Sequence, residues 1–332
     1  MKKTTLFSLI PAMGTIIGCG PAPAPPQNSS NPNAYTIVTT TGMVGDLALA
    51  AAGEQGNVKS LMGSGIDPHL YSPTRGDVIA LQGADIVFYN GLHLEGQMTD
   101  VLHQLGREGK PVAGVSHPLE AIDGYLMEEH GQADPHVWMD LAAWKLALGE
   151  VTQHLIQFDP ENATVYESNA AAYRLQLEGL DAYVKKVIAS IPESQRVLVT
   201  AHDAFSYFGR AYAVDVRGIQ GISTESEAGI RDIEDLVAFL VEKNIPAVFV
   251  ESSVADKNVR ALVEGAAAKN HSVRIGGELF SDAMGAPGSY EGTYIGMMDH
   301  NATLIARALG GEAPKTGFQG KLTPRTEDAH GH

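Results

Sequence analysis

The chain contains only one cysteine and far fewer basic than acidic residues. The single cysteine, Cys19, excludes a disulfide within the molecule. Lysine and arginine together number 23, against 39 aspartates and glutamates, so the formal net charge is −16. That balance argues against a nucleic-acid partner, whose phosphates must be neutralised by basic side chains. An acidic surface keeps a protein soluble, and it also raises the local concentration of cations.

The hydrophobic stretch at the N-terminus is short. Residues 6–17 are interrupted by Pro11 and Gly14 and are too few to span a bilayer as a helix. The stretch follows two lysines and ends in Ile-Ile-Gly-Cys, which resembles a bacterial lipobox. We therefore predict a lipoprotein signal peptide at residues 1–18 and a lipid on Cys19. An ordinary signal peptide with an incidental cysteine is the alternative.

The next segment cannot build a hydrophobic core. Residues 20–33 consist mainly of proline, alanine, serine and asparagine, and such segments form extended, semi-rigid spacers. We predict a tether at residues 19–34 that holds a globular body away from a membrane. The expected location is extracytoplasmic and membrane-anchored, in a periplasm or on the outer face of the cytoplasmic membrane.

From residue 35 onward, short β-rich runs alternate with helical patterns. The whole chain is 44% hydrophobic and 19% charged, which is ordinary for a globular protein. The alternation is typical of mainly parallel sheets covered by helices. The predicted strands are residues 35–40, 57–62, 85–89, 111–115, 196–200, 215–219, 247–251 and 272–275. The predicted helices beside them are residues 43–52, 74–81, 97–105, 230–243, 253–269 and 294–309.

A long helical region, residues 140–158 and 162–190, separates the two sets of strands. Its second part has no proline and one glycine, and at ~1.5 Å per residue it spans about 40 Å. We predict an α/β fold of two lobes, each with a mainly parallel four-stranded sheet flanked by helices, joined by one long rigid helix. No flexible Gly/Ser linker is present, which argues against large lobe closure. The predicted boundaries are 35–160 for the N-terminal lobe, 161–191 for the linking helix, 192–311 for the C-terminal lobe and 312–332 for a fraying polar tail.

Three of the 12 histidines stand where a predicted element ends or begins. His69 and His136 each complete an Asp-Pro-His tripeptide, and His202 follows the strand at 196–200. Asp282, in a glycine-containing stretch after the last strand, is a fourth candidate. Ligands of open α/β sheets bind at the carboxyl ends of strands, and imidazole with carboxylate suits first-row transition metals.

Acidic residues near these histidines are candidates for a supporting role. Asp67, Asp134 or Asp203 can accept the second imidazole N–H of a ligand and so set its tautomer, and Glu251 is a further candidate. The plain alternatives stay open at this point, because isolated histidines near loops are usually surface or capping residues. Asp-Pro pairs are common turn formers, and Asp282 can cap a helix or turn.

Several longer motifs resemble one known family. The chain contains Ile-Asp-Pro-His-Leu-Tyr at 66–71, Asn-Gly-Leu-His-Leu-Glu at 90–95, Asp-Pro-His-Val-Trp-Met-Asp at 134–140 and Thr-Ala-His-Asp-Ala-Phe at 200–205. In this order, over about residues 35–309, they resemble the TroA-like metal-binding lipoproteins of bacterial ABC importers. The resemblance implies two lobes joined by one helix, and a metal between them held by His69, His136, His202 and Asp282.

The resemblance also implies a function without catalysis. We expect a monomer that binds a divalent metal and delivers it to a membrane permease. The cargo is Zn²⁺ or Mn²⁺, with Fe²⁺ also open, because the third ligand position is His202 and the segment before His136 has no long histidine-rich loop. His330 and His332 at the C-terminal end can gather metal weakly, although an end without function is the simpler interpretation.

Two other functions fit part of the pattern. A zinc hydrolase would use the same ligands with Asp203 or Glu251 as the base, but the sequence has no His-Glu-x-x-His motif. A surface adhesin with a structural metal would also suit a lipid anchor and a tether.

Overall fold

The computed structural model describes residues 31–323. The predicted signal peptide, Cys19, most of the tether, and His330 and His332 lie outside the described residues. In the N-terminal lobe the strands are β1 (Tyr35–Thr39), β2 (Gly56–Ser60), β3 (Ile86–Tyr89) and β4 (Val112–Gly114). They form one parallel sheet in the order β2-β1-β3-β4. The four-stranded parallel sheet predicted for this lobe is therefore confirmed.

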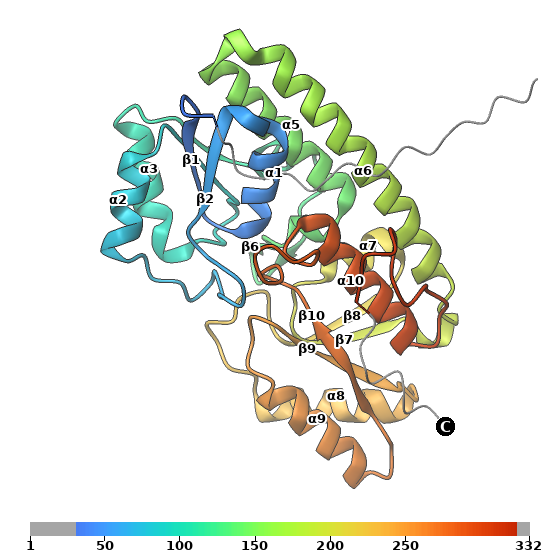
Figure 1. The fold of residues 1–332 in the computed structure, drawn as a ribbon. Helices are drawn as coiled ribbons and strands as arrows, with labels where there is room; N and C mark the ends of the chain where they lie inside the picture. Colours follow the sequence, from blue (N-terminus) through green and yellow to red (C-terminus); the bar gives the residue numbers. More distant parts are fainter. Residues whose placement is uncertain (1–30, 324–332) are drawn as a thin grey trace, which may run out of the picture.

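Helices cover both faces of this sheet. They are α1 (Gly42–Ala52), α2 (Arg75–Gly83), α3 (Thr99–Arg107) and α4 (His117–Glu120). Helix α1 is almost entirely apolar and begins at Thr41, whose side chain accepts a hydrogen bond from the backbone of Val44. Helices α2 and α3 lie on the other face (Figure 1) and enclose a second cluster around Val38, Val87 and Leu102. The apolar residues of the inner strands β1 and β3 are thus covered from both sides of the sheet.

In the C-terminal lobe the strands are β7 (Val197–His202), β8 (Asp215–Gln220), β9 (Ala247–Glu251) and β10 (Arg274–Leu279). They are hydrogen-bonded as two parallel pairs, β7–β8 and β9–β10, and β7 lies beside β9 (Figure 1). The last strand begins and ends later than the predicted 272–275, and its register with β9 shifts between Ile275 and Gly277. The helices of this lobe are α7 (Ser206–Tyr212), α8 (Ile230–Glu242), α9 (Lys257–Ala268) and α10 (Tyr294–Ala308).

The helix α6 (Ala163–Ala189) runs along both lobes with α5 (Leu141–Phe158) beside it (Figure 1). A small antiparallel hairpin, β5 (Glu128–Glu129) and β6 (Gln132–Ala133), precedes α5. Buried α6 side chains recur every three or four residues and face one continuous core. They are Tyr166, Ala170, Tyr173, Leu177, Leu180, Val184, Val187 and Ile188. This shared core gives a physical reason for the rigid connection that the sequence predicts.

A buried carboxylate joins the linking helix to both lobes. Asp46 of α1 accepts a hydrogen bond from the hydroxyl of Tyr173 in α6, and a second from the backbone N–H of Tyr294 at the start of α10, 3.2 Å away. Burial raises the pKa of Asp46 to about 6, although both hydrogen bonds act to lower it. Three elements from distant parts of the sequence therefore meet at one side chain.

The C-terminal segment that the structure describes is packed rather than frayed. The backbone N–H of Phe318 donates to the carboxylate of Asp299, at 2.8 Å to Oδ1, and the Phe318 ring lies 5.4 Å from that of Tyr183. Leu322 is buried. Within the polar tail predicted at 312–332, Phe318 and Leu322 therefore pack against the rest of the protein. Among residues 31–323, no helix combines the length and apolar character needed to cross a membrane.

Candidate metal centre

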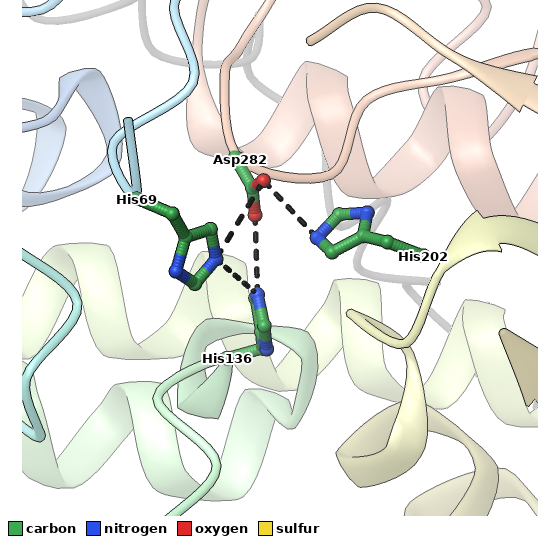
Figure 2. A group of neighbouring side chains, drawn as sticks. All are labelled: His69, His136, His202 and Asp282. Carbon is green, nitrogen blue, oxygen red and sulfur yellow. Dashed lines mark hydrogen bonds and ion pairs between the residues drawn. The ribbon is translucent and has the colours of Figure 1, made fainter. Parts of the chain in front are cut away.

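Three imidazoles and one carboxylate meet between the lobes (Figure 2). One ligand atom from each of His69, His136, His202 and Asp282 lies within 4.8 Å of all the others. The Nε2 atoms of His69 and His136 are 3.2 Å apart. The carboxylate of Asp282 lies 3.3 Å from Nε2 of His136 and 3.1 Å from Nε2 of His202, and 4.0 Å from that of His69. All four side chains are buried, so residues up to 213 positions apart in sequence form one enclosed group.

The repeated Asp-Pro-His tripeptide forms the same local turn twice. The carboxylate of Asp67 accepts a hydrogen bond from the backbone N–H of His69 at 2.9 Å. The carboxylate of Asp134 accepts one from the backbone N–H of His136, also at 2.9 Å. Such turns over Asx residues are a property of the local sequence. They hold the two histidine loops in a defined shape before any ion arrives.

Carboxylates also fix the orientation of two imidazoles. The Nδ1 atom of His136 lies 2.7 Å from Oδ1 of Asp134, and that of His202 lies 2.6 Å from Oε2 of Glu251. The other oxygen of Glu251 accepts a hydrogen bond from the backbone N–H of His202. Each ring therefore presents Nε2 to the centre of the group. This is the arrangement that raises the basicity of metal-binding histidines.

The other two acidic candidates, Asp67 and Asp203, do not hydrogen-bond an imidazole ring within the described part of the chain. Asp67 reaches the backbone of His69 rather than its ring, and its second oxygen accepts a hydrogen bond from the hydroxyl of Thr224 at 2.6 Å. Thr224 belongs to the C-terminal lobe, so this contact joins the two lobes beside the site. The carboxylate of Asp203 accepts a hydrogen bond from the hydroxyl of Ser206 at 2.7 Å and contacts the start of α7. Its position next to His202 in the sequence does not bring it to the imidazole.

The pKa values of the four side chains are shifted in different directions. Burial lowers the pKa of His69 to about 4. Burial also disfavours charge on His136, but the carboxylates of Asp134 and Asp282 outweigh it and raise its pKa to about 9. In the same way, Asp282 and Glu251 outweigh burial and raise the pKa of His202 well above its usual value. Burial opposes ionisation of Asp282 as well, yet the two imidazoles hold its pKa well below its usual range.

The donor set fits a divalent transition metal. Ligands about 2.1 Å from a tetrahedral ion lie roughly 3.4 Å from one another. Four of the six ligand pairs are 3.1–4.0 Å apart, which brackets that value, and all six lie within 4.8 Å. Among the residues that the structure describes, both oxygens of Asp282 and Nε2 of His202 are buried without a hydrogen-bond partner. Buried polar atoms without partners cost free energy. An ion bound among them would satisfy these atoms together.

Two residues that the sequence did not single out position this site. The indole N–H of Trp138 donates to the carbonyl oxygen of Ser281 at 2.9 Å, which fixes the residue before Asp282. The hydroxyl of Tyr207 donates to the carbonyl oxygen of Asp134 at 3.0 Å. Both contacts bridge elements distant in sequence. Trp138 lies in the motif Asp-Pro-His-Val-Trp-Met-Asp at 134–140, whereas no motif in the sequence contains Tyr207.

Replacing Trp138 with phenylalanine should lower the free energy of unfolding by about 1–3 kcal/mol, because the carbonyl of Ser281 loses its buried donor. Urea denaturation of the metal-free protein measures this. The matched control is Trp144→Phe, since Trp144 is equally buried and its indole N–H has no hydrogen-bond partner within residues 31–323. Equal losses in the two variants would show that the bond to Ser281 contributes nothing.

Comparison with known proteins places these features in a family. A family model described as "Zinc-uptake complex component A periplasmic" matches residues 37–308. The manganese-binding lipoprotein MntA of Bacillus subtilis is 45% identical over 309 residues, which cover 93% of this chain and 100% of that protein. The zinc-binding protein TroA of Treponema pallidum is 46% identical over 273 residues, which cover 82% of this chain and 88% of that protein.

Solved structures agree with the sequence matches. The structure of the periplasmic zinc-binding protein TroA from Treponema pallidum matches with a TM-score of 0.80 and 46% identity, covering 83% of this chain and 99% of that one. Fe(III)-bound YtgA from Chlamydia trachomatis matches with a TM-score of 0.77 and 27% identity, covering 84% and 99%. The TroA-like resemblance seen in the sequence motifs is thus confirmed. The chain belongs to the family of zinc-uptake complex component A periplasmic proteins.

Proposed function

We propose that this protein is the extracytoplasmic substrate-binding component of an ABC importer, and that its cargo is a divalent transition metal. His69, His136, His202 and Asp282 are the proposed ligands. The observation that carries the proposal is their convergence into one buried group, with imidazole nitrogens and carboxylate oxygens facing one another. A membrane permease is the proposed partner, and the protein is proposed to act as a monomer.

The proposed cargo is zinc or manganese, with iron(II) as a further candidate. The names of the relatives include a manganese-binding lipoprotein and a zinc-binding protein, which supports both metals. Three nitrogens and one oxygen favour zinc in affinity, because affinity rises along the series from Mn²⁺ to Cu²⁺ and remains high at Zn²⁺. The carboxylate of Asp282 supplies the hard oxygen that Mn²⁺ prefers.

The proposed anchoring and domain boundaries follow the sequence. A lipid on Cys19 and a tether at 19–34 would hold the two lobes, 35–160 and 192–311, near the permease, with the helix at 161–191 between them. Relatives of similar length are named lipoproteins, which supports the anchor. Release would need only small motions of the second lobe, since α6 packs into a core shared by both lobes.

A role in transport is favoured over hydrolysis. Four protein ligands fill a tetrahedral coordination shell, whereas catalytic zinc sites keep a position for water. Both candidate bases already have partners. Glu251 contacts the ring and accepts a hydrogen bond from the backbone N–H of His202, and Asp203 accepts a hydrogen bond from the hydroxyl of Ser206. An adhesin with a structural metal differs from a carrier in one measurable respect, because a carrier must lose its metal reversibly without unfolding.

Elemental analysis and titration test the proposal. The purified protein should bind one tight equivalent of Zn²⁺ or Mn²⁺ in competition with a chelator, and it should stay folded after the metal is removed. Replacing His69 with alanine should weaken Zn²⁺ binding by about 10²–10³-fold, since ~10–16 kcal/mol of zinc binding is shared among four ligands. His103→Ala, an exposed histidine on α3, is the control and should bind as the wild type does. Unchanged binding by His69→Ala would reject the ligand assignment.

A further inference from the structure

A second group of potential ligands lies outside the buried site. Glu150 and His154 stand one turn apart on α5, and His117 begins the neighbouring helix α4. One carboxylate oxygen of Glu150 lies 3.2 Å from Nε2 of His154 and 3.7 Å from Nδ1 of His117. Two imidazole nitrogens therefore face the same carboxylate oxygen.

These residues share a cavity with the buried site. The cavity has a volume of about 1060 Å³, and its lining includes His69, His117, Glu150 and His154. Of the lining side chains, His117 is 75% exposed and His69 is 6% exposed. Two more histidines, His93 and His103, line the same cavity. Its wall thus carries imidazoles from the surface to the buried group.

We infer that His117, Glu150 and His154 form a second, weaker site for a divalent transition metal at the outer part of this cavity. Two imidazoles and one carboxylate are a ligand set that Zn²⁺ and other first-row metals accept, with water completing the shell. The contacts of Glu150 with the two imidazoles, 3.2 and 3.7 Å, are close to the roughly 3.4 Å expected between ligands of one tetrahedral ion, whereas the two imidazole nitrogens lie more than 4.8 Å apart. The exposed His117 side chain can rotate to close the shell around the ion.

The ligand sets of the two sites predict different metal affinities. The buried group has four protein ligands that are held by neighbouring carboxylates. The outer group has three, and of these His117 is mostly exposed and must be ordered when the ion binds. The outer site should therefore bind more weakly and exchange its ion faster. This inference rests on the proposed function for the identity of the ion.

Zinc titration of the full chain separates the two sites. With one equivalent of Zn²⁺ already bound, further Zn²⁺ should give a second, weaker binding event by calorimetry. The double variant His117→Gln with Glu150→Gln should weaken that event by at least about tenfold while the first equivalent binds as before. Both replacements keep side chains of similar size, so the fold is preserved.

The control is the double variant His330→Gln with His332→Gln, which removes two imidazoles from the C-terminal end. The second event should survive this change. The inference is overturned if the wild type binds only one equivalent, or if the second event persists in the cavity variant. If the wild type shows no first, tight binding event, the proposed function itself is contradicted. The two failures are therefore distinguishable.

Discussion

Replacing Asp282 with asparagine should weaken Zn²⁺ binding by about 10²–10³-fold and Mn²⁺ binding by more. Asp282 is the one anionic member of the proposed ligand set, and its carboxylate contacts His136 and His202 at 3.3 and 3.1 Å. Asparagine keeps the shape but removes the charge, and one of four ligands accounts for roughly 3–4 kcal/mol of zinc binding. Mn²⁺ should lose more because it depends more on carboxylate oxygen than Zn²⁺ does.

Asp203→Asn is the matched control for this change. This substitution also removes one negative charge, at the residue next to His202. In the wild type, however, the carboxylate of Asp203 accepts a hydrogen bond from Ser206 and does not face the ligand group. Competition titrations with Zn²⁺ and Mn²⁺ on both variants measure the difference. Equal losses in the two variants would mean that general negative charge, rather than ligation by Asp282, attracts the metal.

Metal affinity should rise steeply with pH between about pH 5 and 8. In the metal-free protein, the pKa of His136 is raised to about 9 and that of His202 lies well above its usual value, so both imidazoles carry protons in this range. A metal ion must displace both protons. Affinity therefore increases by up to ~100-fold per pH unit, and it falls as the pH drops. His69, with a pKa of about 4, is already neutral and releases no proton.

Calorimetry in two buffers of different ionisation enthalpy counts the released protons. About two should leave per Zn²⁺ bound at pH 7. The Asp134→Asn variant should release closer to one, because the carboxylate of Asp134 raises the pKa of His136. Binding that is independent of pH, or equal proton release in wild type and variant, would contradict the charge states described for the group.

Much of the local structure follows from short-range sequence properties. The alternation of apolar runs and helical patterns predicted the strands and helices of the first lobe and the long helix, because apolar runs and amphipathic periodicity depend on residues close together in the chain. The Asp-Pro-His tripeptide also fixes its own turn, as the matching hydrogen bonds of His69 and His136 show. Element ends were less predictable. The strand β10 starts and ends later than predicted, and its pairing with β9, including the register shift between Ile275 and Gly277, cannot be read from its own residues.

The roles of the acidic neighbours could not be predicted from position alone. Asp203 and Asp134 both adjoin or lie near a histidine in the sequence, yet only Asp134 reaches an imidazole. Glu251 lies 49 residues from His202 and nevertheless orients its ring. Whether a carboxylate supports a histidine depends on how β7 and β9 lie against each other, which is a property of the packed lobe.

The sequence by itself determined which residues have the chemistry for a metal site, where the longer helices and most strands lie, and the turns that present His69 and His136. These are local properties, set by residue type and short-range hydrogen bonds. Only the tertiary structure decided that four side chains from both lobes face one another, and that His69 of this group lines one cavity together with His117, Glu150 and His154. The reason is that the packing of α6 against both lobes sets the distances between segments far apart in the chain.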